Sequence, residues 1–235
     1  MNTDVYGTFL KDFYFDKLEG NVLLHNNYGE AEELPVDSFF RNEEDILDVE
    51  VFAMNLCVGN ILDIGAGTGP HSVILQRNGF NVTAIEQSKG ACEVMKLRGI
   101  KEIIQQDVMT YTEQKYNTLL MMMNGIGFCG YIEELKLFLN HAKNLLLPNG
   151  QILFDSSDVA YLYEGQEDAD NDSYYGEIDY QYEYKGKKGE WFSWLYIDEQ
   201  SMRAIAKECG WNMQLIYQDE DEHYLGRLTL TEEQL

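Results

Sequence analysis

The middle of the chain alternates between two hydrophobic periodicities. Short apolar runs of strand length are separated by stretches whose apolar residues recur every three or four positions. The runs predict strands at residues 60–65, 80–85, 102–106, 117–123 and 151–155, and helices from about 70, over 88–98 and over 132–146. This β-α-β alternation predicts an α/β fold with a doubly wound, mostly parallel sheet.

The first 42 residues carry a different pattern. Apolar and aromatic residues recur there at a spacing of four, as in Val5 and Phe9, which predicts a helix with one apolar face. We interpret residues 1–42 as an N-terminal, helical cap that either packs on the domain or covers a substrate pocket. A further helix is expected over 43–57, with Asn42 at its N-terminal cap.

An insertion is expected after the fifth strand. Residues 164–173 form an acidic loop, and residues 177–184 then alternate strictly between polar and apolar side chains. A glycine-containing turn at 185–189 and a returning run at 191–197 predict a β-hairpin, so that the insertion spans 174–197. A helix over 199–209 and strands over 211–218 and 223–230, one of them antiparallel, complete a seven-stranded sheet. We expect residues 1–235 to form a single domain.

Composition and charge narrow the classes of function. Hydrophobic residues make up 45% of the 235 positions, which is enough for a sizeable core. The formal net charge of −24 disfavours binding to nucleic acid or to an anionic membrane surface. No apolar run approaches the ~20 residues that span a bilayer. Because the four cysteines show no close pair and the N-terminus is polar, we expect reduced thiols in a cytoplasmic protein.

A glycine-rich turn follows the first strand of the alternating region. Gly65, Gly67 and Gly69 stand between this strand and the next helix, where glycine lets the backbone turn tightly and approach a ligand. A dinucleotide-binding turn requires a third glycine at position 70, which is Pro70 here. The turn therefore suits a nucleotide-like ligand other than a dinucleotide.

Acidic residues stand at the ends of three successive strands. Asp63, at the first strand end, suits a ligand amino group, or else it supports the glycine turn. Glu86 can accept both hydroxyls of a ribose, with Gln87 beside it. Asp107 can accept an adenine amino group, and the Val108 N–H can meet a ring nitrogen. Ligands of open α/β sheets bind at this carboxyl edge.

These segments together resemble a known family. The runs Ile61-Leu-Asp-Ile-Gly-Ala-Gly-Thr-Gly69, Val82-Thr-Ala-Ile-Glu-Gln-Ser88 and Gln106-Asp107-Val108 resemble successive motifs of class I S-adenosylmethionine (SAM)-dependent methyltransferases. The resemblance covers residues 46–155, and residues 198–230 fit the closing helix and strand pair. It implies a seven-stranded Rossmann-like sheet and SAM as cofactor. The expected cofactor residues are Arg41, Asp63, Gly65, Ala66, Gly67, Thr68, Glu86, Gln87, Asp107, Val108, Asn124 and Gly125.

Some of these residues have open alternatives. Asn124 and Gly125 follow the fourth strand, where the family places groups near the methyl, but they also suit a simple turn. Arg41 could pair with the cofactor carboxylate, with an anionic substrate or with a surface acid. His71 could be a base or a helix-start imidazole near the cofactor or the surface. No histidine shows metal-site spacing, so we expect no metal, and no catalytic base can be named.

The sequence leaves three functions to weigh. The leading hypothesis is a SAM-dependent methyltransferase acting on a small molecule, with a homodimer as a possible assembly. The alternatives are a non-catalytic SAM-binding scaffold and a nicotinamide-dependent oxidoreductase. The acceptor and its methylated atom stay open.

Overall fold

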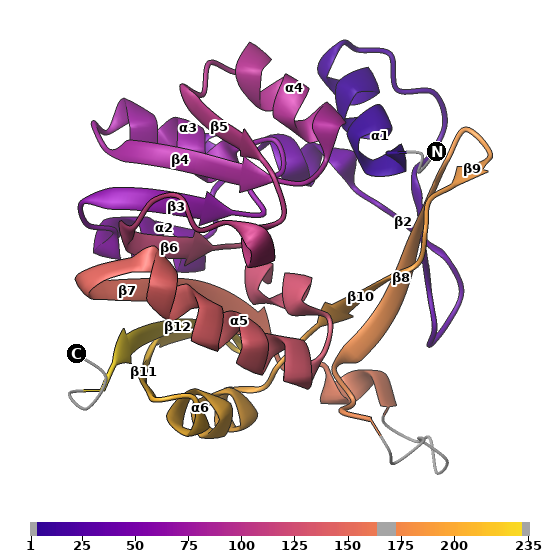
Figure 1. Cartoon of the computed structure of the whole chain (residues 1–235). Coiled ribbons are helices and arrows are strands. Elements are labelled where there is room, and N and C mark those ends of the chain that lie inside the picture. Colours follow the sequence, from indigo (N-terminus) through magenta and orange to yellow (C-terminus); the bar gives the residue numbers. More distant parts are fainter. Residues whose placement is uncertain (1–3, 164–172, 232–235) are drawn as a thin grey trace.

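The computed structural model of the chain describes residues 4–163 and 173–231. Its main sheet has seven strands in the order β11-β12-β7-β6-β3-β4-β5 (Figure 1). The strands are β3 (Asn60–Ile64), β4 (Asn81–Glu86), β5 (Glu102–Gln105), β6 (Tyr116–Met121), β7 (Leu146–Ser157), β11 (Trp211–Gln218) and β12 (His223–Leu230). Strands β3 to β7 are parallel, and β12 runs antiparallel to both β7 and β11. The predicted doubly wound seven-stranded sheet is confirmed.

Helices cover both faces of this sheet. On one face lie α2 (Asp48–Leu56), α3 (Pro70–Arg77) and α4 (Lys89–Leu97), and on the other lie α5 (Ile132–Leu145) and α6 (Glu199–Glu208). Successive strand residues point to opposite faces, so neighbouring residues pack into the cores on opposite sides of the sheet. Ile61 packs against α2 and α3, whereas Leu62 belongs to the core beneath α5 and α6, and both are fully buried.

Two expected elements are shorter than the hydrophobic pattern indicates. The helix expected over 43–57 begins only at Asp48, because the Glu50 carboxylate accepts the Leu47 N–H at 2.9 Å and closes the first turn there. Strand β6 ends at Met121 rather than residue 123. Met123 and Asn124 both have positive φ angles, 67° and 53°, so the chain leaves the extended conformation. Short 3₁₀ helices fill several connections: η1 (Val36–Phe40), η2 (Glu43–Asp45), η3 (Val108–Thr110), η4 (Gly125–Cys129) and η5 (Ala160–Tyr163).

The N-terminal region and the inserted hairpin form a second sheet together. Its order is β10-β8-β1-β2, with β9 paired to β8. The strands are β1 (Leu23–Asn26), β2 (Glu32–Glu33), β8 (Glu177–Tyr184), β9 (Lys187–Lys188) and β10 (Phe192–Leu195). The hairpin is confirmed. The cap, however, is not only helical, because β1 pairs with β8 along four residues.

This second sheet stands opposite the carboxyl ends of the main strands (Figure 1). We call it, together with α1 (Val5–Tyr14) and the rest of residues 4–42 and 174–197, the cover. Helix α1 docks on α4 through two glycines, since a Cβ on Gly90 would lie 2.5 Å from the backbone of Gly7. Asp4 joins the two helix starts by accepting the N–H of Gly7 at 2.7 Å and of Gly90 at 2.9 Å.

Candidate cofactor and methyl-transfer site

The glycine turn presents one open backbone position. Gly65, Gly67 and Gly69 have φ angles of 67°, 57° and 76°, which explains why these positions are glycine. Gly65 is exposed, and a Cβ there would meet no atom within 4 Å. A Cβ on Gly67 would lie 2.9 Å from the Tyr6 hydroxyl, and one on Gly69 would overlap Ile100. The backbone at Gly65 therefore forms a cradle that a ligand can approach.

Glu86 lies beside this cradle at the end of β4. Its Oε2 accepts the Gly67 N–H at 3.0 Å, and its Oε1 accepts the Ser88 N–H at 2.8 Å. Each carboxylate oxygen has a second lone pair, so both can still accept a hydroxyl group. Burial raises the pKa of Glu86 above its ordinary value, and the backbone donors at Ser88 and Gly67 oppose that rise. The residue is half-buried, as a contact to a partly enclosed ligand requires.

The other two strand-end acids sit at different depths. Asp63 is 2% exposed, and its Oδ2 accepts a hydrogen bond from Ser72 Oγ at 2.6 Å. Burial raises its pKa, against the nearby charge of His71. This contact ties Asp63 to helix α3 rather than to the glycine turn, and the contact of Asp63 with a ligand stays a prediction. Asp107 is half-buried and accepts the Met109 N–H at 2.9 Å, so its second oxygen is available.

Three predicted contact residues use their side chains in other ways. Thr68 donates its hydroxyl to the Phe39 carbonyl and accepts a hydrogen bond from Arg98 at 2.6 Å, which ties the glycine turn to the cover. Gln87 is exposed beside Glu86. Val108 is buried, and its carbonyl lies 2.9 Å from His141 Nε2. For Thr68 and Val108, only the backbone is therefore suited to a cofactor contact.

A buried charge network lies under the glycine turn, on the face of α2 and α3. Arg41, expected to meet an anion, donates from Nη2 to Glu50 Oε1 at 2.8 Å and from Nε to the Ser38 carbonyl at 3.1 Å. The same Glu50 oxygen lies 2.6 Å from His71 Nε2. The contact of Arg41 with a cofactor carboxylate stays a prediction. Glu50 was not identified from the sequence, because it falls on a helix rather than at a strand end.

A second network lies at the end of β7. Asp155 is fully buried; its Oδ2 lies 2.8 Å from His223 Nε2, and its Oδ1 accepts the Gly125 N–H at 3.2 Å. Asn124 accepts a hydrogen bond from Ser157 Oγ at 2.9 Å through its side-chain oxygen. The rule that found Asp63, Glu86 and Asp107 would also have found Asp155, since it follows the apolar core of the fifth strand.

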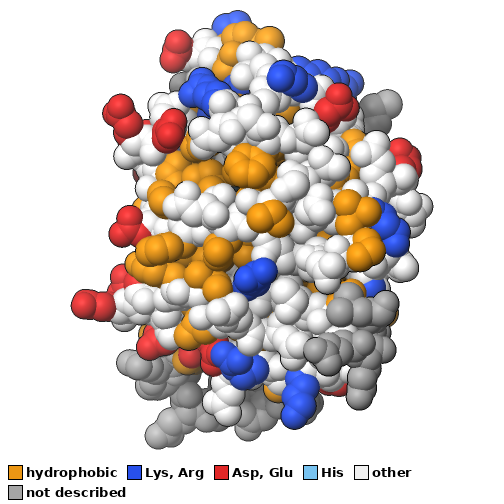
Figure 2. Space-filling model, turned by 90° about the vertical axis from the view of Figure 1, so that its left-hand side faces the viewer, with side chains coloured by type: hydrophobic (Ala, Val, Ile, Leu, Met, Phe, Trp, Pro, Cys, Tyr) orange, Lys and Arg blue, Asp and Glu red, His pale blue; other side chains and the backbone are white. Residues whose placement is uncertain are grey.

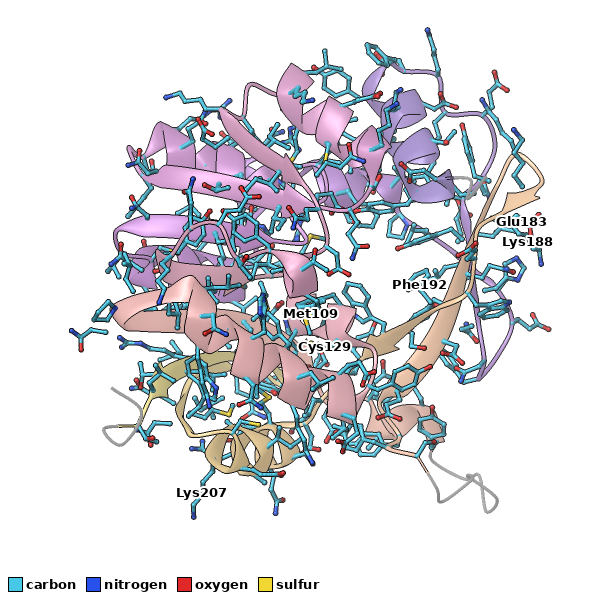
Figure 3. The ribbon with its side chains drawn as sticks, in the orientation of Figure 1. Met109, Cys129, Glu183, Lys188, Phe192 and Lys207 are labelled. Carbon is cyan, nitrogen blue, oxygen red and sulfur yellow. The ribbon has the colours of Figure 1, made fainter. Side chains whose placement is uncertain are left out.

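Aromatic side chains line the face of the cover that is turned to the main sheet. Tyr182 stacks on Tyr6 with ring centroids 5.5 Å apart, and Phe192 lies 5.0 Å from Tyr182. Trp194 donates from Nε1 to the Asn124 carbonyl at 3.1 Å. Figure 3 shows Phe192 on the inner side of this sheet and Glu183 with Lys188 on the outer side.

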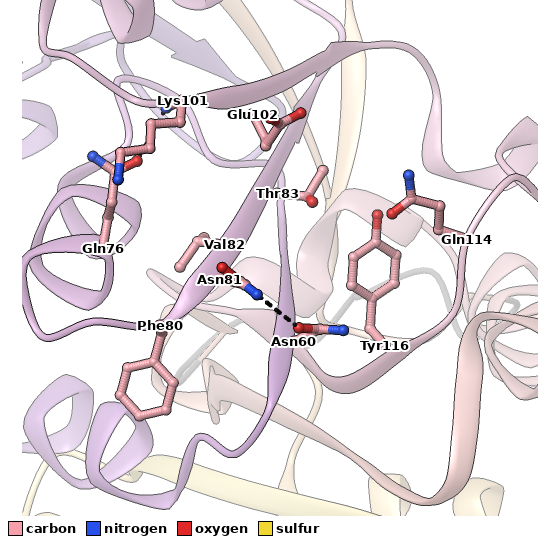
Figure 4. A pocket seen from close by; sticks show the side chains of 10 residues that line it. All are labelled: Asn60, Gln76, Phe80, Asn81, Val82, Thr83, Lys101, Glu102, Gln114 and Tyr116. Carbon is pink, nitrogen blue, oxygen red and sulfur yellow. Dashed lines mark hydrogen bonds between the residues drawn. The ribbon is translucent and has the colours of Figure 1, made fainter.

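A hollow at the opposite edge of the sheet is a different feature. It has a volume of about 450 Å³ and lies at the amino ends of β3, β4, β5 and β6 (Figure 4). Its lining includes Asn60, Gln76, Asn81, Lys101 and Glu102. The face of the amino ends shows hydrophobic side chains only in separate patches (Figure 2). Open α/β sheets bind their ligands at the carboxyl edge, so this hollow is not the predicted site.

The structure also bears on metal ions, thiols and membranes. Among residues 4–163 and 173–231, no group of three or more His, Cys, Asp or Glu side chains is placed to hold a metal ion. All four cysteines are free and buried, as expected. Within the described part of the chain, no helix is long and apolar enough to cross a membrane.

Comparison with known proteins decides the family. A family described as "Methyltransferase domain" matches residues 36–216. The chain belongs to this methyltransferase family. A SAM-dependent methyltransferase from Bacteroides fragilis, solved with S-adenosylhomocysteine, is 39% identical over 97% of this chain and 95% of its own, with a TM-score of 0.89. Comparison with curated proteins gave no match.

More distant structures share the fold alone. The CcbJ methyltransferase from Streptomyces caelestis is 14% identical, with 96% of this chain and 98% of its own covered and a TM-score of 0.63. The DhpI-SAM-HEP complex is 16% identical over 73% of this chain and 78% of its own, with a TM-score of 0.56. The protein is thus a SAM-dependent methyltransferase with a Rossmann-like fold. The oxidoreductase and non-catalytic alternatives are set aside.

Proposed function

We propose that this methyltransferase binds SAM across the carboxyl ends of β3, β4 and β5 and methylates a small molecule held under the cover. The observation that carries the proposal is the open cradle at Gly65 beside the half-buried Glu86. A nucleoside with an attached amino acid fits this edge, because the open backbone at Gly65, a ribose-binding acid at Glu86 and a further acid at Asp107 follow one another along it.

Different residues of the site would contact different parts of the cofactor. Glu86 would accept the ribose hydroxyls, and Asp107 with the Val108 N–H would meet the adenine. The backbone of Gly65 to Thr68 would contact the amino-acid part, with Asp63 and Arg41 nearby. Tyr6 lies 2.9 Å from the Cβ position of Gly67, so α1 of the cover would close over that part.

Positioning would supply most of the rate enhancement. SAM, when bound, supplies a methyl group on a positively charged sulfur, which is already electrophilic. The chain's task is to hold the acceptor in line with that methyl, and such alignment is worth about 7–11 kcal/mol of a barrier. The acceptor's lone pair forms the new bond while the carbon–sulfur bond breaks and its electrons stay on sulfur. A dedicated base is needed only if the acceptor must lose a proton during attack.

The inner face of the cover indicates an acceptor without negative charge. Directly paired strand residues share a face, which places Glu32, opposite Leu24, on the same side as Tyr182. Glu32 accepts a hydrogen bond from the Tyr28 hydroxyl at 3.0 Å. On the described part of this face, the strand registers place aromatic residues together with Glu32, Leu24, Asn26 and Ile178. The one cation that they place there is Lys187, opposite Tyr184, and it is exposed at the hairpin turn. Aromatic faces and a carboxylate favour a neutral or cationic ligand, such as an amine.

Calorimetry and labelling test these proposals separately. Titration with SAM and S-adenosylhomocysteine tests the cofactor site, and no heat from either would refute it. Transfer of a labelled methyl group from SAM to a metabolite extract then tests the acceptor, with the labelled product separated by charge. Product found only among anionic metabolites, or only on protein, would overturn the acceptor proposal and leave the cofactor site intact.

The remaining proposals concern the protein's surroundings. The four free, buried thiols support a cytoplasmic location, where thiols stay reduced. The net charge of −24 argues against nucleic acid as a partner. A homodimer is proposed only as an assembly to be tested by light scattering.

A further inference from the structure

The turn after β6 is held in a conformation that its own residues do not favour. Met123 and Asn124 are consecutive non-glycine residues in the left-handed region, with φ angles of 67° and 53°. Side chains crowd the backbone there, although asparagine tolerates the region better than methionine does. Such strain persists only where the surroundings impose it, and it clusters at functional sites.

Two restraints on this turn come from the main sheet. Ser157 Oγ donates to Asn124 Oδ1 at 2.9 Å, and Asp155 Oδ1 accepts the Gly125 N–H at 3.2 Å. Asp155 is itself held by His223 at 2.8 Å. Strand β7 therefore fixes both the side chain of Asn124 and the residue that follows it.

The third restraint comes from the inserted hairpin. Trp194, on β10, donates its indole N–H to the main-chain carbonyl of Asn124 at 3.1 Å. The indole fits there only because position 127 is glycine, since a Cβ on Gly127 would overlap the indole ring. The contact between Trp194 and Asn124 therefore depends on the absence of a side chain at Gly127.

With both of its oxygens bonded, the side chain of Asn124 has its NH₂ group left. Its side-chain nitrogen has no hydrogen-bond partner in residues 4–163 and 173–231, and the side chain is half-buried at the carboxyl edge. The bond from Ser157 fixes the amide plane, so this NH₂ group is presented in a defined direction. It can donate to an acceptor molecule.

We propose that Trp194 is a positioning residue for methyl transfer: it holds the Met123–Asn124 turn in its left-handed form, so that the hairpin of the cover completes the methyl-transfer site. The inference rests on the proposed function, in which the acceptor is held under the cover. It makes the cover a part of the reacting geometry as well as a shield from water. A hairpin that moved away would release the turn.

The test removes the indole N–H and keeps an aromatic ring. Trp194→Phe is compared with Trp191→Phe, which changes a 53% exposed tryptophan on the same hairpin. Ser157→Ala removes a second restraint on the same turn. Amide hydrogen exchange of residues 122–128 reports the turn, with residues 91–97 of α4 as internal reference. The affinity for S-adenosylhomocysteine and the initial rate of labelled methyl transfer from SAM to the extract complete the set.

Loss of the hydrogen bond from Trp194 should change hydrogen exchange in the turn itself. We expect Trp194→Phe to speed exchange of 122–128 by about five- to ten-fold and to lower transfer by a similar factor. Exchange of 91–97 and the affinity for S-adenosylhomocysteine should stay within about two-fold, since the cofactor cradle is not touched. Ser157→Ala should act in the same direction, and Trp191→Phe should change nothing.

The outcomes separate this inference from the proposed function. Unchanged exchange at 122–128 in Trp194→Phe would overturn the positioning role. An equal loss of transfer and of S-adenosylhomocysteine affinity would overturn it too, because that pattern reports general damage. If the unmodified protein binds neither SAM nor S-adenosylhomocysteine, the proposed site itself fails, whereas exchange still reports whether Trp194 holds the turn.

Discussion

Glu50 on α2 and His71 on α3 meet in the interior, with Glu50 Oε1 2.6 Å from His71 Nε2. Their side chains are only 1% and 4% exposed, and Arg41 of the cover binds the same oxygen at 2.8 Å. Burial alone would lower the pKa of His71, but the hydrogen bond to Glu50 and the charges of Asp63 and Asp155 raise it above its ordinary value. The imidazole of His71 therefore links the helix after the glycine turn to the helix before β3.

Loss of the Glu50 charge should lower the stability of the protein. Glu50→Gln keeps the shape of the side chain but leaves Arg41 and His71 without their shared counter-charge. Breaking a buried ion pair in this way typically costs about 3–5 kcal/mol, so we expect the free energy of unfolding in urea to fall by that amount. The matched change Glu44→Gln, at an exposed position, should alter it by less than about 0.5 kcal/mol. A similar small effect of both changes would show that the network carries no net charge pairing.

The pair of His223 and Asp155 predicts a pH dependence of stability. The hydrogen bond to Asp155 raises the pKa of His223 above its ordinary value near 6.5, against partial burial, and the charges of Asp219 and Glu50 add to the rise. A raised native pKa means that protonated His223 stabilises the fold fully below pH 6.5 and loses this contribution as the pH rises through the native pKa. The difference in melting temperature between the wild type and His223→Gln should accordingly shrink from pH 6 to pH 9. A difference that grew with pH would contradict the assignment.

Glu86 offers the sharpest test of the cofactor site. Glu86→Gln keeps an oxygen for one backbone N–H but removes the charge that would bind the ribose hydroxyls. Hydrogen bonds to a charged group contribute about 1.5–3 kcal/mol, so the affinity for S-adenosylhomocysteine should fall roughly 10- to 100-fold in calorimetry. Glu102→Gln makes the same change at an exposed position at the amino end of β5 and should leave the affinity intact. Equal affinities of the two variants for S-adenosylhomocysteine would show that Glu86 does not bind the cofactor.

The contact between α1 and α4 predicts a link between the cover and the cofactor. In Gly90→Ala the new methyl group would lie 2.5 Å from the Gly7 backbone, so α1 must move. Overpacking of this kind costs about 1–3 kcal/mol. We expect faster proteolysis of the N-terminal region and weaker binding of S-adenosylhomocysteine, because Tyr6 would leave its position above Gly67. Lys89→Ala, one residue earlier on an exposed site, is the control and should change neither.

The amino-acid sequence by itself determined the main sheet and the outline of the cofactor edge. Each strand and helix of the alternating region covers a few residues whose periodicity is local, as with the helix that Ser88 caps and Gly99 follows. Gly65, Glu86 and Asp107 were identifiable because a parallel sheet brings all its carboxyl ends to one edge. The boundaries of α2 and β6 were less accurate, because the Glu50 cap and the left-handed turn at Asn124 interrupt an otherwise continuous apolar pattern.

Only the tertiary structure decided which distant residues meet. Strand β1 has four residues and no alternation of its own, and its partner β8 lies more than 150 residues away, so nothing in the sequence predicted their pairing. The same holds for His223 with Asp155 and for Trp194 with Asn124, since each contact joins elements at separate places in the chain. Local periodicity reflects which face a residue turns to the core. The partner on that face depends on how the whole chain folds, which is why the cover and its hold on Asn124 became visible only in three dimensions.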